Sequence, residues 1–195
     1  MTEVESVKQQ SSPELVGKAP FRFRRFISRG VILEHRLALA HRLRADYREK
    51  NPVVVGVLNG AFMFMADLVR EMNIACEMDF IKLSSYRDQM TPTSINLSKD
   101  VEIDLRNRHI LLVEDIIDTG KSEEFLRRHM QSKLPASLAM VAMFVKSRQT
   151  DGASGVEYVG MEIPDEFVVG YGLDHAQQWR QLPDLYVLQP SEGNL

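Results

Sequence analysis

The chain has 195 residues, a formal net charge of −3, 44% hydrophobic residues and 26% charged residues. This is the length of one domain with a substantial core, and the negative charge argues against a general nucleic-acid-binding protein. A single cysteine, Cys76, cannot form an internal disulfide and fits a reducing compartment. No apolar run approaches membrane-spanning length and the N-terminus lacks a signal-peptide core, so a cytoplasmic protein is expected.

Hydrophobic periodicity predicts helices and strands that alternate along most of the chain. Residues 1–20 are polar and are expected to form a disordered extension, which leaves residues 21–195 as one domain. Helices are predicted over residues 31–49, 61–72 and 123–130. Strands are predicted over residues 53–58, 78–83, 101–105, 109–113, 137–145, 156–163, 167–171 and 185–188. A long mobile loop is expected over residues 84–96, where Pro92 lies among Ser and Thr residues.

The order of these elements predicts the fold class. Strands that alternate with helices indicate an α/β fold with a parallel sheet, because each parallel connection needs a crossover. Strands dominate the last third of the chain, which indicates a smaller antiparallel hood beside the helix-flanked core. In an open parallel sheet, ligands bind at the carboxyl ends of the strands.

The most informative segment follows the apolar strand predicted at residues 109–113. It contains three carboxylates, Glu114, Asp115 and Asp118, and then a small-residue turn that opens a helix. Carboxylates can bind a cation and ribose hydroxyls, whereas the N–H groups of such a turn and of a helix N-terminus bind phosphate. The segment therefore predicts a site for a phosphorylated sugar.

The segment allows two other interpretations. Gly120-Lys121-Ser122 matches the end of a P-loop, but the P-loop pattern requires glycine where Asp115 stands, so a P-loop is rejected. An ordinary surface turn with acidic residues is the other possibility. Because neighbouring strand residues point to opposite faces, Glu114 and Asp115 can face one ligand only if the strand ends before them.

The segment from Val113 to Ser122 resembles the signature that binds phosphoribosyl diphosphate (PRPP) in the phosphoribosyltransferases. The acid at Asp118 resembles the hypoxanthine-guanine branch, and matching segments extend over about residues 53–188. The resemblance implies a phosphoribosyltransferase core and an enzyme of purine salvage. Such an enzyme transfers the 5-phosphoribosyl group from PRPP to hypoxanthine or guanine, giving IMP or GMP and pyrophosphate, with xanthine as a further candidate base. It also implies Mg²⁺ as cofactor, small-molecule substrates, no nucleic-acid or membrane partner, and a homodimer or homotetramer.

The resemblance also implies a role for each matching residue. Asp118 is the catalytic base. The PRPP-binding residues are Glu114, Asp115, Asp118, Thr119, Gly120, Lys121 and Ser122. Pyrophosphate is bound by Asn59, Gly60 and Arg180, although the family commonly has lysine in place of Asn59 and often a cis peptide before it. The purine is bound by Lys146, Phe167, Val168 and Asp174, and magnesium by Asp174, Glu114 and Asp115. Ser85 and Tyr86 lie on a loop that closes over the substrates.

Taken singly, Lys146 is more simply a surface cation and Phe167 a core aromatic, so their joint order and spacing carry the prediction. Glu123 and Glu124 are unusual beside a phosphate and are expected to point away from it. Two other functions stay open: a PRPP- or nucleotide-sensing regulator, and a transferase for adenine or a pyrimidine. The absence of a basic face disfavours the regulator, and Lys146 disfavours adenine.

Overall fold

A six-stranded sheet forms the centre of the computed structural model, which describes residues 13–18, 20–86, 94–118, 120–147 and 155–189. The strands lie in the order β5-β4-β3-β6-β7-β8, and all neighbours are parallel except the antiparallel pair β4 and β5. Their bounds are β3 Val53–Leu58, β4 Glu77–Tyr86, β5 Ser94–Lys99, β6 His109–Ile117, β7 Ser137–Lys146 and β8 Tyr158–Ile163. The predicted α/β class with a largely parallel sheet is confirmed.

The strand order reverses its direction between β3 and β6. From β3 the chain passes outward to β4 and β5, then returns to the other side of β3 and continues outward through β6, β7 and β8. The carboxyl edge at such a reversal is where open α/β sheets bind ligands, because the two connections leave in opposite directions and open a crevice. The topology therefore places a candidate site at the ends of β3 and β6.

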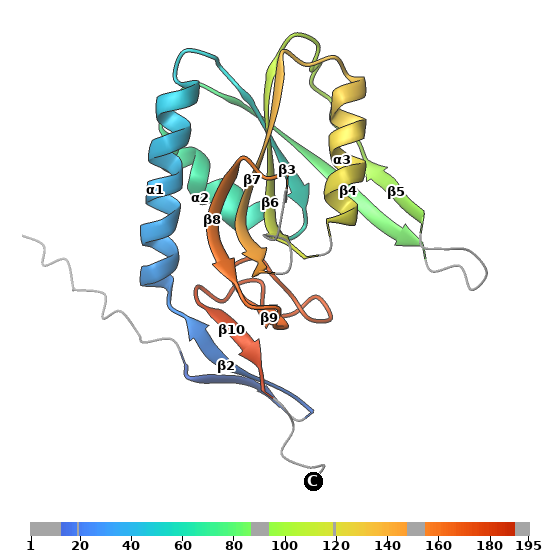
Figure 1. Cartoon of the computed structure of the whole chain (residues 1–195). Helices are drawn as coiled ribbons and strands as arrows, with labels where there is room; N and C mark the ends of the chain where they lie inside the picture. Colours follow the sequence, from blue (N-terminus) through green and yellow to red (C-terminus); the bar gives the residue numbers. More distant parts are fainter. Residues whose placement is uncertain (1–12, 19, 87–93, 119, 148–154, 190–195) are drawn as a thin grey trace, which may run out of the picture.

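Three helices cover the two faces of the described sheet: α1 Arg29–Tyr47, α2 Phe62–Met72 and α3 Lys121–Ser132. Helices α1 and α2 pack together on one face, and α3 lies on the other (Figure 1). Ser28 caps the N-terminus of α1, and its hydroxyl accepts a hydrogen bond from the Val31 N–H at 3.5 Å. None of these helices combines the length and apolarity that a membrane span requires.

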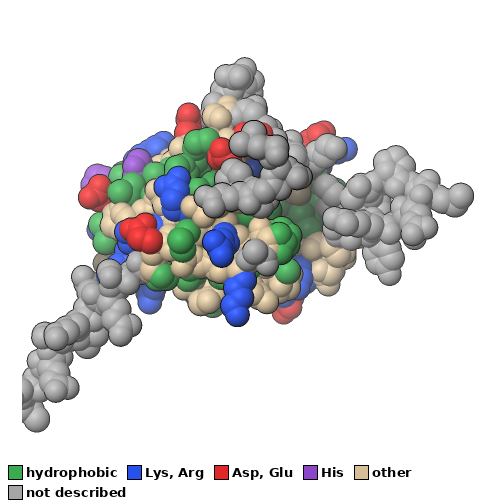
Figure 2. Space-filling model, turned by 90° about the horizontal axis from the view of Figure 1, so that it is seen from below, with side chains coloured by type: hydrophobic (Ala, Val, Ile, Leu, Met, Phe, Trp, Pro, Cys, Tyr) green, Lys and Arg blue, Asp and Glu red, His purple; other side chains and the backbone are tan. Residues whose placement is uncertain are grey.

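A second, four-stranded antiparallel sheet forms the hood. Its strands lie in the order β1-β2-β10-β9, with bounds β1 Leu15–Lys18, β2 Phe21–Ile27, β9 Val168–Val169 and β10 Leu185–Leu188. The hood lies beyond the arrowheads of β7 and β8, at the carboxyl edge of the main sheet (Figure 1). Seen from the hood end, Lys and Arg side chains are scattered among hydrophobic ones (Figure 2). The predicted hood is therefore confirmed and covers the candidate site.

Several predicted bounds are wrong. The extension predicted over residues 1–20 contains strand β1, which pairs with β2, whereas residues 1–12 and 19 lie outside the described residues. The short strand predicted at 101–105 is not formed, because two backbone N–H groups of that segment instead bond to the buried Asp79 carboxylate. The loop predicted over 84–96 is wrong at both ends, where β4 pairs with β5, and residues 87–93 lie outside the described residues.

Candidate active site

The crevice opens where two strands of the main sheet separate. Strand β3 pairs with β6 only as far as Gly56 and Val113, whereas β7 stays paired with β6 as far as Ile117. The prediction that the β6 strand ends at Val113 is therefore wrong. The two acids that follow Val113 stand inside the strand, at the point where its β3 side becomes unpaired.

Because the strand continues, Glu114 and Asp115 face different cavities, as strand alternation requires. Asp115 lines a cavity of about 350 Å³ beneath the hood, which we call the hood cavity. Glu114 lines a neighbouring cavity of about 250 Å³ at the turn before α3, which we call the turn cavity. Ile116 and Asp118 line both cavities, so the two lie side by side.

The hood cavity brings together predicted residues from four distant segments. Its walls are Gly60, Asp115, Ile116, Asp118, Lys146, Phe167, Val168, Leu173, Asp174 and Arg180. The predicted catalytic base and the predicted stacking aromatic thus share one cavity. Asn59 is exposed and is not among the lining residues.

The turn cavity is lined by residues of the PRPP-like segment and its neighbours: Val57, Leu83, Glu114, Ile116, Ile117, Asp118, Gly120, Ser122 and Glu123. Gly120 precedes helix α3 with φ 74°, a left-handed conformation that glycine adopts without strain. The first N–H groups of a helix have no intrahelical partner, so this cavity ends on anion-binding donors. Thr119 and the side chains of Lys121, Ser85 and Tyr86 lie outside the described part of the structure.

Lys146 ends strand β7, and its side chain reaches into the hood cavity. The residue is only 8% exposed, and its Nζ lies 3.0 Å from Asp118 Oδ1 and 3.3 Å from Asp165 Oδ1. A buried ammonium needs such partners, because desolvation of an unpaired charge is costly. An ammonium has three N–H bonds, so two carboxylates leave one for a ligand. The sequence assigned no role to Asp165, and a single acid in a loop gave no signal of this pairing.

Phe167 presents its ring at the other side of the same cavity. The side chain is 45% exposed, which is unusual for an aromatic residue of a folded core. Phe23 and His175 support it, with ring centroids 6.2 Å and 5.6 Å away and the His175 ring nearly perpendicular. Phe167 is thus held in place and retains surface for stacking against a planar ligand.

Backbone segments approach closely at the base of the hood cavity. A Cβ on Gly60 would lie 1.7 Å from Asp115 Oδ2, and a Cβ on Gly172 would lie 2.1 Å from the Gly60 carbonyl oxygen. Position 172 therefore requires glycine, because the neighbouring atom is a backbone oxygen and its φ is 101°, whereas a side chain at position 60 would displace the Asp115 carboxylate. Gly172 was not predicted. The Leu58–Asn59 peptide before Gly60 is cis, as it often is in the family that the sequence resembles.

Arg180 and Asp174 form an ion pair at this end of the cavity. Arg180 Nη2 lies 2.6 Å from Asp174 Oδ1, and Arg180 Nη1 donates to the Gly172 carbonyl at 2.7 Å. Asp174 also accepts a hydrogen bond from the Gln177 N–H at 2.8 Å. The predicted pyrophosphate-binding arginine and the predicted metal-binding acid are therefore held next to each other and to Gly60.

Comparison with known proteins agrees with this geometry. Residues 32–176 match the family described as "Phosphoribosyl transferase domain". The chain belongs to the phosphoribosyltransferase family. It is 47% identical over 140 residues to the hypoxanthine phosphoribosyltransferase of Haemophilus influenzae, and the aligned region covers 70% of this chain and 78% of the relative. It is 39% identical over 164 residues to the hypoxanthine-guanine phosphoribosyltransferase of Streptococcus pneumoniae, covering 84% and 91%.

Solved structures of the phosphoribosyltransferase family share the fold. A hypoxanthine phosphoribosyltransferase from Staphylococcus aureus superposes with a TM-score of 0.80 at 32% identity, covering 98% of this chain and all of that one. A hypoxanthine-guanine phosphoribosyltransferase from Bacillus anthracis gives a TM-score of 0.78 at 36% identity, covering 85% and 98%. The likeness thus extends over nearly the whole of each of these two solved chains.

The acids of this phosphoribosyltransferase carry an electrostatic cost that a cation would relieve. Burial raises the pKa of Glu114 well above its usual value, and the nearby charges of Asp115 and Glu123 raise it further. Burial likewise raises the pKa of Asp115 to about 6, although backbone hydrogen bonds and Arg180 lower it in part. Because burial disfavours the ionised forms of Glu114 and Asp115, a cation bound beside them would stabilise their carboxylates.

The donor set fits magnesium that arrives with a phosphorylated substrate. Among the described residues, no three His, Cys, Asp or Glu side chains are grouped to hold a metal by themselves. Magnesium typically binds one or two carboxylates and completes its shell with water and substrate phosphates. Asp115 and Asp174 line the same cavity and meet that requirement, whereas Glu114 lines the neighbouring one.

The expectation that both acids of the first α3 turn point away from the phosphate turn is wrong for Glu123. This residue is buried and lines the turn cavity, where it lies 3.4 Å from Arg127 Nε. Glu124 pairs with the exposed Arg128 at 3.2 Å and does not line either cavity. Glu123 and Arg127 lie on the inward face of α3, whereas Glu124 and Arg128, with the same i,i+4 spacing, lie on its exposed face.

Proposed function

We propose that this phosphoribosyltransferase transfers the 5-phosphoribosyl group of PRPP to a 6-oxopurine, namely hypoxanthine or guanine, with xanthine as a further candidate. The product is the nucleotide, IMP or GMP, and pyrophosphate is released. The observation that carries the proposal is the meeting of Asp118, Lys146 and Phe167 in one cavity. A base-binding cation, a stacking ring and a proton acceptor can therefore contact a single purine.

The purine would lie between Phe167 and Lys146. Base–aromatic stacking contributes about 1–3 kcal/mol without selecting the base, so Lys146 must provide the selection. An ammonium only donates hydrogen bonds, and it therefore suits the 6-oxo group of hypoxanthine or guanine. The 6-amino group of adenine would face it donor to donor. The backbone of Val168 lines the cavity and is proposed to contact the ring edge.

The reaction is a substitution at C1′ of the ribose. The purine N9 attacks C1′, the bond from C1′ to pyrophosphate breaks with its electron pair on the leaving oxygen, and Asp118 accepts the proton from purine N7. Positive charge builds on the sugar during this step. The ribose is proposed to lie where the two cavities adjoin, with Asp115 on the side of the hood cavity and Glu114 on the side of the turn cavity, and their carboxylates would favour that charge.

The leaving pyrophosphate is proposed to lie against Arg180, Gly60 and Asp174. Arg180 supplies a guanidinium, whose fork of N–H donors suits phosphate oxygens. Magnesium held with Asp174 and Asp115 would neutralise the leaving group. The 5′-phosphate is proposed to bind the turn cavity through the backbone of Gly120 and Ser122. Asn59 lacks the charge of the usual lysine and contributes at most through its backbone.

A turnover assay tests the function. Purified protein is incubated with PRPP, Mg²⁺ and hypoxanthine, guanine, xanthine or adenine in turn, and nucleotide and pyrophosphate are quantified. Equimolar nucleotide and pyrophosphate from a 6-oxopurine, and none from adenine, are expected. PRPP binding without turnover of any base would instead favour a regulator. A homodimer or homotetramer and a cytoplasmic location stay predictions.

A further inference from the structure

Tyr171 occupies an unusual backbone position beside the hood cavity. Gly170, Tyr171 and Gly172 have φ values of 103°, 49° and 101°, and a tyrosine with positive φ is rare because its Cβ is crowded there. The turn is fixed on the hood side, where the Tyr171 N–H donates to Leu182 at 2.8 Å and the Gly172 N–H to Arg180 at 2.9 Å. A strained conformation persists only where its surroundings hold it.

The Tyr171 side chain reaches away from the cavity into a cluster of charges between two helices. It is 7% exposed, and its hydroxyl accepts from Arg36 Nη1 at 2.7 Å and donates to Asp67 Oδ2 at 3.1 Å. Arg36 of α1 also bonds Asp67 at 2.5 Å and Glu71 at 2.8 and 2.6 Å, both on α2. Hydrogen bonds to ionised groups are the stronger kind, so this cluster is a firm attachment.

The two segments joined by this hydroxyl are the ones that form the end of the cavity. Helix α2, which carries Asp67, begins two residues after Gly60. Tyr171 is followed by Gly172, which lies against the Gly60 carbonyl, and then by Leu173 and Asp174, which line the cavity. The Tyr171 hydroxyl thus bonds α2, which follows the Gly60 loop, to the turn that carries Gly172 and Asp174.

We propose that Tyr171 is a positioning residue for the pyrophosphate side of the site. Its hydroxyl holds the Gly60 loop and the Asp174 turn in register, so that Gly60, Asp174 and Arg180 contact the leaving group together. The kinetic part of this inference rests on the proposed function, whereas the structural part does not. Lys146 comes from β7, and neither it nor Phe167 is among the hydrogen-bond partners of the cluster. We therefore expect purine binding to depend on Tyr171 less than pyrophosphate binding does.

Tyr171→Phe removes the hydroxyl alone and leaves the Arg36–Asp67 and Arg36–Glu71 bonds in place. We expect the KM for PRPP and the inhibition constant of pyrophosphate to rise together, by about 3- to 10-fold, because small displacements of contacting groups weaken binding strongly. The KM for hypoxanthine should change less than about twofold, since its contacts lie elsewhere in the cavity. Amide hydrogen exchange at Ala61 and at residues 172–174 should become faster.

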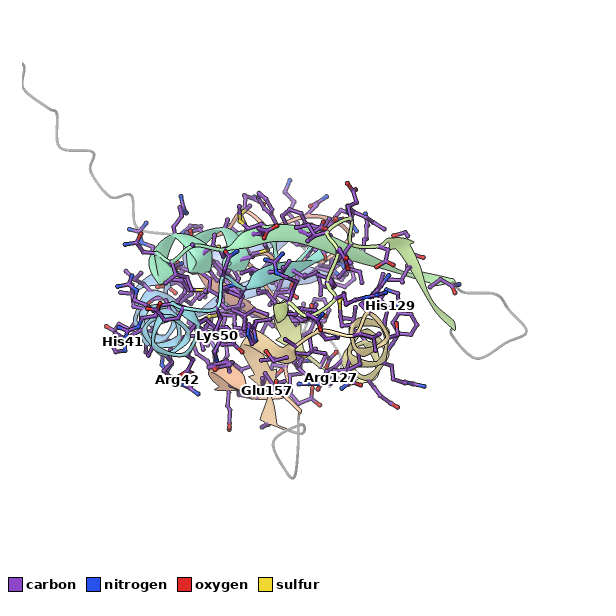
Figure 3. The ribbon with its side chains drawn as sticks, turned by 90° about the horizontal axis from the view of Figure 1, so that it is seen from above. His41, Arg42, Lys50, Arg127, His129 and Glu157 are labelled. Carbon is purple, nitrogen blue, oxygen red and sulfur yellow. The ribbon has the colours of Figure 1, made fainter. Side chains whose placement is uncertain are left out.

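Tyr158→Phe is the matched control. The Tyr158 hydroxyl donates to Asp46 Oδ2 at 2.7 Å and thereby joins α1 to β8. Tyr158 is the first residue of β8, however, and lies at the end of the sheet opposite to the candidate site. Arg42, which lies 5.4 Å from its ring centroid, and the neighbouring Glu157 are labelled at that end in Figure 3. This variant should lower the melting temperature comparably and leave every kinetic constant unchanged.

The outcomes separate the two proposals. A wild-type protein that turns over no base contradicts the proposed function, while hydrogen exchange still tests the positioning role of Tyr171. The role is overturned if exchange at Ala61 and residues 172–174 is the same in Tyr171→Phe as in wild type. It is also overturned if the KM values for PRPP and hypoxanthine rise by the same factor, or if Tyr171→Phe behaves like Tyr158→Phe.

Discussion

Lys146 Nζ lies 3.0 Å from Asp118 Oδ1, so the cation proposed to select the purine is paired with the carboxylate proposed to deprotonate it. A 6-oxo group beside Lys146 would accept a hydrogen bond from the third N–H of the same ammonium, the one that the two carboxylates leave for a ligand. The same cation would then contact both the purine and the carboxylate proposed to accept its N7 proton.

Asp118→Asn should lower kcat by about 10²- to 10⁴-fold, because an amide cannot accept the purine proton. The KM for PRPP should change little, since the other acids and the phosphate turn remain. Asp165→Asn is the matched control: it removes the other carboxylate on Lys146, at 3.3 Å, but Asp165 does not line the cavity. Steady-state kinetics check both, and a kcat for Asp118→Asn near that of wild type would refute the base assignment.

Lys146→Ala should raise the KM for hypoxanthine and guanine strongly while the affinity for PRPP stays near that of wild type. The 6-oxo group loses its donor, and a site built to bond such a group discriminates by about 10⁴- to 10⁵-fold. Asp118 and Asp165 also lose their cation, but Lys146 does not line the turn cavity, where the 5′-phosphate is proposed to bind. Lys133→Ala removes a lysine that pairs with Asp100 at 2.7 Å, away from both cavities, and should leave the kinetics unchanged. An equal loss of purine and PRPP binding in Lys146→Ala would contradict the assigned role.

The main sheet was predictable from sequence because buried parallel strands are continuous apolar runs, as at residues 53–58 and 109–113. The end of β6 was not, because carboxylates at 114 and 115 interrupt the apolar run although the backbone stays paired with β7. Strand β2 was not predicted, because its arginines interrupt the apolar run. Its alternation of Phe21, Arg22, Phe23 and Arg24 was a signal that could have found it, and Phe23 is fully buried.

The candidate site was predictable where one segment carries several functional groups, as from Glu114 to Ser122. The pairs that hold the site together were not, because Lys146–Asp165 and Gly60–Gly172 join residues far apart in sequence. Only the fold brings such partners together. Helix α1 shows the same limit: its apolar pattern indicated a helix, yet Val31, Leu33 and Leu37 are exposed, so the pattern did not give the buried face.

Gly60→Ala should abolish most activity, because its Cβ would lie 1.7 Å from Asp115 Oδ2 and push the loop or the carboxylate out of place. Gly30→Ala in the first turn of α1 is the control, since its Cβ would be 3.7 Å from the nearest atom, Ser28 Oγ. This control should keep full activity and gain about 0.4–1 kcal/mol in stability. Kinetics and thermal melting check both variants, and a fully active Gly60→Ala would show that the close approach is dispensable.

Asp115→Asn should stabilise the ligand-free protein at pH 7.5, by about 1–3 kcal/mol. The pKa of Asp115 is raised by burial from 3.8 to about 6, so the folded protein binds more protons than the unfolded chain between these values. Wild-type stability therefore falls as pH rises through this window, and the advantage of Asp115→Asn should vanish near pH 4. Denaturant unfolding of both proteins at pH values from 4 to 8 measures this difference in stability.

Asp100→Asn should change the stability of the protein in the opposite direction to Asp115→Asn. Although burial opposes it, hydrogen bonds from Lys133 and His129 lower the pKa of Asp100 to about 2. The ionised Asp100 thus stabilises the fold above pH 4, and that contribution is lost as pH falls toward 2. Asp100→Asn should be less stable than wild type at pH 7.5. If Asp115→Asn is also destabilised at pH 7.5, the electrostatic account of the acids is wrong.

The central claim is that one nucleotide spans the two adjacent cavities, with its base under the hood and its phosphate at the turn before α3. A crystal structure of the IMP complex measures this directly. We predict the purine ring on Phe167 with O6 within hydrogen-bond distance of Lys146 Nζ, and the 5′-phosphate on the N–H groups of Gly120 and Ser122. A base bound away from Lys146 and Phe167, or a phosphate bound outside the turn cavity, would contradict it.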